Sequence, residues 1–327
     1  MGGTTLWAMN PTLVILAAGM STRYGRLKQL EPVGPSGEAL LDYAVFDARM
    51  AGFSRVVFII RPELEEDFRN HFPSGTPPDL DVVFHHQRVE DLPCLGSLGG
   101  VQGQVEIDPG TRTKPWGTAH ALLTARPHLS GPFVVLNADD FYGRSAFVQA
   151  ASWLNETGAA HPPDRPVFGL VAYTLDETLS PHGGVSRAVC RGDLEGWLEE
   201  IEEVLNIHRA DGEIRGRTVD GTEVVLPGQE VISTGFWIFT PAIFSSLEEG
   251  FRRFFAGAPG ATEDAEFLIP AEVCRLLRDE VIRVWVLRAR DPFFGITHPR
   301  DWEWVSEKIG ELVENGTYPS PLWGAES

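Results

Sequence analysis

Residues 16–29 combine small side chains with two cations, directly after a short apolar run. Small residues such as Gly19 let backbone N–H groups approach an anion closely. Arg23 can hold a phosphate through two parallel hydrogen bonds, and Lys28 adds a mobile positive charge. The alternative is an ordinary glycine turn with two solvated basic residues. The apolar run before the loop and the presence of both cations favour a binding site for the phosphates of a nucleotide.

Two adjacent carboxylates, Asp139 and Asp140, follow another apolar run at residues 132–136. Mg²⁺ binds carboxylate oxygens and retains several of its waters. A carboxylate at the end of a buried strand, facing a triphosphate, is therefore where this ion is expected. The alternative is a structural turn or a helix cap, which aspartates also favour.

These side chains need a scaffold that brings the ends of several strands to one edge. Short apolar runs between turn residues predict buried parallel strands, and apolar residues three and four apart predict helices. Their alternation predicts an α/β fold of three layers, α/β/α, with a doubly wound, mostly parallel mixed sheet, and ligands bind such sheets beyond the carboxyl ends of the strands. The expected strands are residues 12–16, 55–60, 81–85 and 132–136, and the expected helices are residues 39–51, 63–71 and 118–125.

After residue 150 the pattern changes, and we expect this half to extend the same sheet. A single domain over residues 11–315 is predicted, divided into a nucleotide-binding half (11–150) and an acceptor-binding half (151–315). Residues 1–10 and 316–327 are expected to be tails. The expected strands here are residues 167–173, 231–239 and 281–287, and the expected helices are residues 193–205, 251–255, 270–277 and 302–313.

Composition and charge exclude several classes of protein. The formal net charge of −19 argues against nucleic acid and anionic membranes as partners, although a few local groups can still hold a small nucleotide. The cysteines Cys94, Cys190 and Cys274 are few and far apart, which favours a reducing compartment. No apolar run reaches the roughly 18 residues of a membrane helix, and the start lacks the layout of a signal peptide. We expect a cytoplasmic protein, and leave open whether it forms a homo-oligomer.

Other chemistries lack their motifs. The first loop is neither GxxxxGK[ST] nor GxGxxG, so P-loop NTPases and Rossmann dehydrogenases lose their main support. The adjacent pair His85 and His86 lacks the spacing of an HExxH zinc site, and no GxSxG nucleophile motif is present.

The first loop, LAAG-x-S-T-R-x-G-x-x-KQL, resembles the signature of the nucleotidyltransferases of the GT-A fold, including the sugar-1-phosphate nucleotidylyltransferases and cytidylyltransferases. The resemblance implies that the glycine loop holds the triphosphate, that Arg23 steadies the pyrophosphate leaving group and that Lys28 neutralises phosphate charge. It implies nucleotide binding by Leu16, Ala17, Ala18 and Gly19.

Two further segments extend the resemblance. Residues 114–122 resemble the G-T-A-x-A element that lies along the nucleotide base, which implies base contacts from Gly117, Thr118 and His120. For His120 the alternative is a polar residue on a helix face. The residues around Asp139 resemble the metal-binding strand end, so Asp139 corresponds to the Mg²⁺ ligand and Asp140 to a supporting or structural residue.

The second half resembles the acceptor side of sugar-nucleotide synthases more loosely. The resemblance implies sugar contacts from Gly184, from Glu202 or Glu203, and from Glu266; a solvated helix face is the alternative for the two adjacent glutamates. Two positions depart from the pattern, because glycines stand at 235 and 295 where an asparagine and a second metal-binding aspartate are expected. Asp291 is then the nearest substitute as a metal ligand.

These expectations combine into a Mg²⁺-dependent transfer of a nucleoside monophosphate from an NTP to a small phosphorylated acceptor, with release of pyrophosphate. A sugar 1-phosphate is the favoured acceptor, and the base stays open. Two alternatives remain: a GT-A glycosyltransferase, and a non-catalytic protein that binds a nucleotide or sugar nucleotide. The cations of the first loop count against the glycosyltransferase, and the glycines at 235 and 295 keep the binding protein open.

Overall fold

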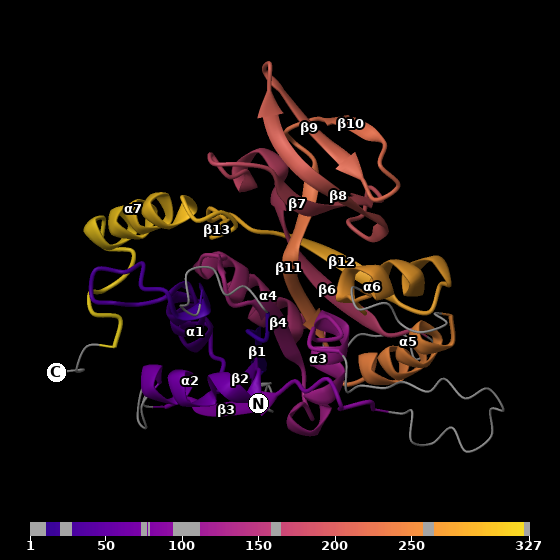
Figure 1. Cartoon of the computed structure of the whole chain (residues 1–327), viewed down its shortest axis with the longest axis horizontal. Helices are drawn as coiled ribbons and strands as arrows, with labels where there is room; N and C mark the ends of the chain where they lie inside the picture. The colour runs from indigo at the N-terminus through magenta and orange to yellow at the C-terminus, as the bar shows by residue number, and fades with distance from the viewer. Residues whose placement is uncertain are drawn as a thin grey trace, which may run out of the picture.

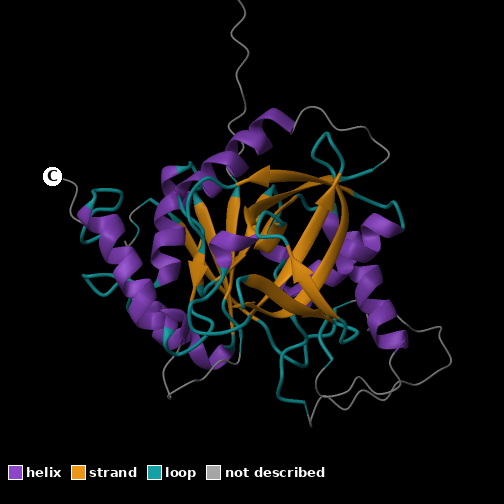
Figure 2. Ribbon diagram, turned by 90° about the horizontal axis from the view of Figure 1, so that it is seen from above, coloured by secondary structure: helices purple, strands orange, loops and turns teal. Residues whose placement is uncertain are grey.

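The computed structural model describes residues 11–19, 28–72, 77, 79–93, 112–157, 165–257 and 265–323. Strands run through the middle of the molecule and helices cover them on both sides (Figures 1 and 2). The described strands are β1 (Thr12–Leu16), β2 (Arg55–Ile60), β3 (Asp81–His86), β4 (Phe133–Asn137), β5 (Asp140–Phe141), β6 (Val167–Thr174), β7 (Val185–Gly192), β8 (Leu198–Ala210), β9 (Glu213–Thr218), β10 (Glu223–Leu226), β11 (Val231–Phe239), β12 (Arg283–Arg288) and β13 (Phe294–Gly295).

Four parallel strands, in the order β3-β2-β1-β4, form the first half of an 11-stranded sheet. Successive residues of β1 point to opposite faces: Leu13 and Ile15 pack into one core cluster, and Val14 packs into the other. All three are buried, because a central parallel strand is covered on both faces. This explains the uninterrupted apolar run, and it confirms the prediction of an α/β fold with a mixed, mostly parallel central sheet.

Helices cover both faces of this sheet. Apolar residues of α1, α2 and α4 pack on one face, and those of α3, α5 and α6 pack on the other, which gives the three layers. The helices are α1 (Leu40–Met50), α2 (Glu65–His71), α3 (Thr118–Thr124), α4 (Arg144–Thr157), α5 (Ile243–Gly257), α6 (Ile269–Arg278) and α7 (Asp301–Glu314), with short 3-10 turns at Lys28–Leu30, Pro62–Leu64, Arg126–His128 and Leu175–Thr178.

The second half continues the same sheet with antiparallel strands. β11 pairs with β4, β6 and β7, and from β7 the sheet runs on through β8, β9 and β10. β12 adds a further parallel pair beside β6. Figure 1 shows β9 and β10 at the far end of this extension, away from the helices of the first half.

The helix expected at residues 193–205 is wrong, because most of this segment lies in strand β8. Its buried residues Leu198, Ile201, Val204 and Ile207 recur every third position, which resembles a helical pattern. The pattern arises from a strand buried on both faces: Leu198 and Ile201 pack into one core cluster, and Val204 and Ile207 pack into the other. Register shifts near both ends of β8 replace the simple alternation of a regular strand.

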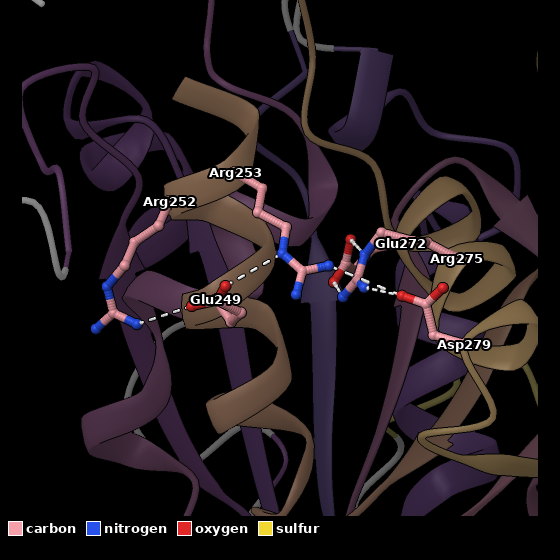
Figure 3. Close-up of polar contacts among 6 residues, drawn as sticks. All are labelled: Glu249, Arg252, Arg253, Glu272, Arg275 and Asp279. Atoms are coloured by element: carbon pink, nitrogen blue, oxygen red, sulfur yellow. Dashed lines mark hydrogen bonds and ion pairs between the residues drawn. The ribbon is translucent and has the colours of Figure 1, made fainter. Parts of the chain in front are cut away.

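A chain of ion pairs fastens α6 to α5 (Figure 3). Arg253 of α5 lies 3.8 Å from Asp279, just after α6, and Asp279 accepts a 2.6 Å hydrogen bond from Arg275. Arg275 also holds the buried carboxylate of Glu272 through two hydrogen bonds, of 3.0 and 2.6 Å. Paired in this way, the buried charge of Glu272 is tolerated, and α6 keeps a fixed position on the sheet.

The segment after α7 was expected to be a tail, but its described part packs against α1. Tyr318 and Leu322 are buried in a small core cluster that includes residues of α1 and α7. The Tyr318 hydroxyl donates a 2.5 Å hydrogen bond to Asp47, whose pKa is raised to about 6 by burial.

No helix in the described ranges combines the length and the apolar character that crossing a membrane requires.

Candidate active site

Two cavities adjoin where β1 and β4 end. The first has a volume of about 250 Å³ and the second about 210 Å³. Four residues line both: Leu16, Thr118, Asn137 and Leu268. The remaining residues of the first cavity are Ala18, Gly19, Gln29, Ile59, Gln87, Lys114, Pro115, Gly117, Ala121, Asp139 and Glu266. The remaining residues of the second are Asp140, Ser186, Arg187, Ala188, Glu203, Ser233, Thr234, Gly235, Trp237, Ile269 and Pro270.

The loop after β1 forms one side of the first cavity. Leu16, Ala18 and Gly19 line it, while Ala17 is buried and donates a 2.8 Å backbone hydrogen bond to Ile59. The short 3-10 turn that begins at Lys28 follows this loop, and the Lys28 ammonium lies 2.5 Å from Asp139 Oδ2. A cation of the first loop and the expected metal ligand therefore meet. Arg23 lies outside the described residues.

The two aspartates after β4 serve different cavities. Asp139 lines the first and Asp140 lines the second. Burial raises the pKa of Asp140 to about 7, and the neighbouring charge of Asp139 adds to the shift. The carboxylate accepts a 3.1 Å hydrogen bond from the Asn137 side chain, which holds it in place. Asp140 therefore lines a cavity itself, although only a supporting or structural role was expected for it.

Side chains from the end of β4 and the start of β5 lie beside the two unexpected glycines, Gly235 and Gly295. A Cβ added to Gly295 would lie 2.1 Å from Asp140 Oδ1, and one added to Gly235 would lie 3.0 Å from Asn137 Nδ2. An aspartate was expected at 295 and an asparagine at 235. The structure therefore has a carboxylate and an amide next to these glycines, supplied by Asp140 and Asn137.

Gly117 allows the chain to pass closely under residues 265–269. Its φ of +98° lies in the left-handed region, and an added Cβ would lie 2.6 Å from the carbonyl oxygen of Phe267. The backbone of Phe267 pairs on either side of it, donating to Trp116 and accepting from Ala119. The Thr118 hydroxyl then accepts a hydrogen bond from the Ile269 backbone, so α3 and α6 begin side by side at the cavities.

We expect Gly117→Ala to destabilise the protein by roughly 2–4 kcal/mol, because the backbone conformation is strained for alanine and the carbonyl of Phe267 must move. Denaturant unfolding of the variant and the wild type measures this difference. Gly131→Ala is the matched control, since a Cβ there meets nothing within 4 Å. Equal losses in the two variants would contradict the close approach at Gly117.

His120 lies behind the first cavity and is not among the described residues that line it. It is fully buried, and its ring stacks on Phe251. Nε2 donates to the carbonyl of Asp91 at 2.6 Å, and Nδ1 accepts from Gln87 Nε2 at 3.0 Å. Gln87 does line the cavity and also donates to the carbonyl of Gly117. His120 was expected to contact the nucleotide base. In the structure it instead holds the side chain of Gln87, which lines the cavity.

Burial lowers the pKa of His120 from its ordinary value of 6.5 to about 4. The unfolded chain therefore takes up this proton first as the pH falls, so the stability contributed by neutral His120 is lost between about pH 6.5 and 4. We expect His120→Gln to remove roughly 2–3 kcal/mol from the pH dependence of the unfolding free energy over this range. Denaturant titrations at several pH values test this, and an unchanged pH dependence would contradict it.

Of the residues expected to contact the acceptor, two line a cavity and two do not. Glu203 lines the second cavity, and Glu266 lines the first, 3.6 Å from the Lys114 ammonium. Glu202 instead forms an ion pair with Arg191, consistent with neighbouring strand residues pointing to opposite faces. Gly184 is absent from the described linings, and its carbonyl accepts a hydrogen bond from His298.

Asp291, expected as a second metal ligand, is also absent from the described linings of both cavities. Its carboxylate accepts a 2.5 Å hydrogen bond from the Ser145 backbone at the start of α4 and packs against Gly143. It therefore caps a helix, whereas Asp140 is the aspartate that lines the second cavity.

The lining residues that were not expected as site residues include four polar ones: Gln87, Asn137, Arg187 and Thr234. Asn137 and Arg187 stand inside segments that carry motifs, but neither residue type predicts a role by itself. Nothing in the sequence around Gln87 predicts that this residue lines a cavity. It reaches the cavity because β3 lies beside β2, and pairing of this kind is not visible in the sequence around it.

Comparison with known families decides the class of this fold. Residues 13–150 match the family described as the MobA-like NTP transferase domain. The similarity to this family covers the first half of the sheet and less than half of the chain. This match confirms the prediction of a nucleotidyltransferase. The matched residues run from β1 into α4 and include the first loop, Gly117 and Asp139, whereas Arg187 and Thr234 of the second cavity lie beyond the match.

Solved structures share the fold over more than nine-tenths of the chain. The inositol-1-phosphate CTP transferase of T. maritima has 16% identity and a TM-score of 0.54, over 93% of this chain and 97% of its own. A UDP-glucose pyrophosphorylase complexed with UDP-glucose has 17% identity and a TM-score of 0.55, over 93% and 99%. A putative glucose-1-phosphate thymidylyltransferase of Bacillus anthracis has 14% identity and a TM-score of 0.58, over 91% and 94%. A comparison with curated proteins found no match.

Proposed function

We propose that this protein transfers a nucleoside monophosphate from an NTP to a sugar 1-phosphate or a similar phosphorylated acceptor, and releases pyrophosphate. The pair of adjoining cavities carries the proposal. A transfer between two substrates requires their reacting groups to meet in a fixed orientation. The NTP occupies the first cavity, beside the glycine loop, and the acceptor occupies the second. Their phosphates meet at the shared wall, near Asn137.

The carboxylates at this wall fit a magnesium ion. Mg²⁺ is usually held by one or two carboxylates together with substrate phosphates and waters. Asp139 and Asp140 provide such a pair, and no larger group of metal-binding side chains occurs in the described part of the chain. The Lys28 ammonium beside Asp139 supports the assignment, because this carboxylate already attracts a cation. We assign Asp139 as the principal ligand and Asp140, in place of Asp291, as the second.

The reaction needs little covalent chemistry from the protein. An oxygen of the acceptor phosphate is already anionic, so it can attack the α-phosphorus of the NTP without a general base, as pyrophosphate leaves on the opposite side. Lys28 releases Asp139 and neutralises the transferring and leaving phosphates, together with Arg23. Bound Mg²⁺ supplies further neutralisation of phosphate charge. Asn137 holds Asp140 in place, and the loop at Gly19 contacts the triphosphate.

The names of the structural neighbours support this substrate class. They are an inositol-1-phosphate CTP transferase, a UDP-glucose pyrophosphorylase and a putative glucose-1-phosphate thymidylyltransferase. Each name joins a nucleotide to a polyhydroxylated ring. The bases differ, so the base used by this protein stays open.

Two other functions are less well supported. A GT-A glycosyltransferase would use the aspartates but would not need Lys28 in contact with Asp139. A non-catalytic binding protein was suggested by the glycines at 235 and 295. The amide of Asn137 and the carboxylate of Asp140 lie beside these glycines, which weakens that suggestion.

A two-step assay tests the proposal. Thermal shifts with Mg²⁺ and each of the four NTPs identify the nucleotide, and pyrophosphate release is then measured with glucose 1-phosphate, inositol 1-phosphate and phosphocholine. We expect release only when NTP, Mg²⁺ and one acceptor are all present. A glycosyltransferase would instead release a nucleoside diphosphate from a sugar nucleotide. Nucleotide binding without turnover across the panel would favour the binding protein.

A further inference from the structure

The second cavity is lined by a guanidinium, that of Arg187, which forms no ion pair among the described residues. Arg187 donates to the carbonyls of Ser186 and Thr178, both at 2.9 Å, and its group lies 5.2 Å from the centre of the Phe293 ring. Its Nε is shielded from solvent and has no hydrogen-bond acceptor within the described residues. It forms no ion pair with a described carboxylate, although Asp140 and Glu203 lie near enough for their charges to interact with it. An arginine keeps its charge in proteins, so this cation is held ready for an anion.

A second polar group of the same cavity is also without a partner. Thr234 is 7% exposed, lines the cavity, and has no hydrogen-bond partner for its hydroxyl within the described part of the chain. Buried polar groups are normally hydrogen-bonded, and leaving one unpaired costs stability. A ligand that accepts hydrogen bonds would satisfy both the Thr234 hydroxyl and Arg187 Nε.

The neighbouring charges limit what this ligand can be. Asp140 and Glu203 line the cavity together with Arg187, so a large polyanion would be repelled. A single phosphate group can lie against the guanidinium, while hydroxyl groups elsewhere on the ligand donate to the carboxylate of Glu203. Glu203 forms no ion pair among the described residues, and its pKa is raised by burial.

We propose that Arg187, assisted by the Thr234 hydroxyl, binds the phosphate of the acceptor, which is a monophosphate ester bearing hydroxyl groups. This proposal rests on the proposed function and adds to it the residue that selects a phosphorylated acceptor. The NTP phosphates belong to Lys28, which is paired with Asp139 of the first cavity, so each substrate has its own cation. Arg187 is thereby a specificity-determining residue of the second cavity.

Arg191 provides a matched control on the same strand, β7. It carries the same side chain but forms ion pairs with Glu200 and Glu202, and it is absent from the described lining of the cavity. Lys28→Met provides the complementary control for the first cavity. Arg187→Lys keeps a positive charge, and Thr234→Val keeps the shape of the side chain, so both remain informative if Arg187→Gln lowers the yield of folded protein.

Inorganic phosphate is the probe for the anion site itself. Equilibrium dialysis with labelled phosphate, on proteins shown to be folded by their melting temperatures, measures its binding. We expect Arg187→Gln to weaken phosphate binding by roughly 10- to 100-fold, and Thr234→Val by about 3-fold or more. Arg191→Gln and Lys28→Met should retain it, and Arg187→Gln should bind NTP like the wild type. Phosphate binding that depends on Lys28 and not on Arg187 would overturn the proposal.

Kinetics separate this proposal from the proposed function. With an active acceptor, Arg187→Gln should raise the KM for the acceptor and leave that for the NTP unchanged. An unchanged acceptor KM would overturn the Arg187 proposal while the transferase function stands. Phosphate binding through Arg187 without pyrophosphate release for any acceptor would support the anion site and count against the transferase.

Discussion

Replacing Asp139 with asparagine is expected to lower turnover by about 1,000-fold or more, because it removes the principal carboxylate for Mg²⁺ and the partner of Lys28. The unfolding free energy should change little, since the side chain of Asp139 is 34% exposed and faces a cavity. Steady-state pyrophosphate release measures the first effect, and denaturant unfolding measures the second. Binding of Mn²⁺, followed by its electron paramagnetic resonance signal, should weaken in parallel.

Asp291→Asn is the control for this prediction. Its carboxylate is bonded to the start of α4, so the variant should lose stability but keep most of its turnover. Asp140→Asn should fall between the two, since Asp140 lines the second cavity. If Asp291→Asn were the more severe variant in turnover, the metal would lie elsewhere and the assignment at the end of β4 would be wrong.

Lys28→Met is expected to lower kcat/KM by about 100-fold, mainly by weakening the binding of the triphosphate. The net charge of the protein is −19, so an anionic nucleotide depends on local cations such as Lys28. Methionine keeps the apolar stem of the side chain, so loss of packing contributes little. Calorimetry of NTP binding, with and without Mg²⁺, measures the effect.

The salt dependence and the metal dependence make this prediction specific. The difference between Lys28→Met and the wild type should shrink at high salt, because the charge interaction is screened. Without nucleotide, the variant should bind Mn²⁺ more tightly than the wild type, since the ammonium no longer competes for Asp139. Equal NTP affinities at low salt would mean that Lys28 points away from the phosphates when the nucleotide is bound.

The sequence predicts the nucleotide-binding half well, for a physical reason. Parallel strands such as β1 and β4 are buried on both faces, so each appears as a continuous apolar run that ends in a loop. The positions of Gly19 and Asp139 follow directly, because both stand just beyond such runs. The family match over residues 13–150 covers this same half.

The second half depends on contacts that no local pattern reveals. The segment that forms β8 has its apolar residues spaced like a helix because it is buried on both faces and is interrupted by register shifts. The side chain of Asn137 lies next to Gly235, and that of Asp140 lies next to Gly295. Both contacts depend on pairing between strands that are far apart in the sequence. Arg187 stands out only when the structure shows that it lines a cavity and that its Nε has no hydrogen-bond acceptor among the described residues.

The most direct test of nucleotidyl transfer is a ³¹P NMR time course of one reaction that contains the protein, Mg²⁺, the NTP it binds and an active phosphorylated acceptor. We predict that the signals of the NTP and of the acceptor monophosphate decline together. Pyrophosphate and a product with a new P–O–P bridge should appear in equal amounts, and none of these changes should occur with Asp139→Asn. Formation of a nucleoside diphosphate and orthophosphate, or of pyrophosphate without a bridged product, would contradict the account.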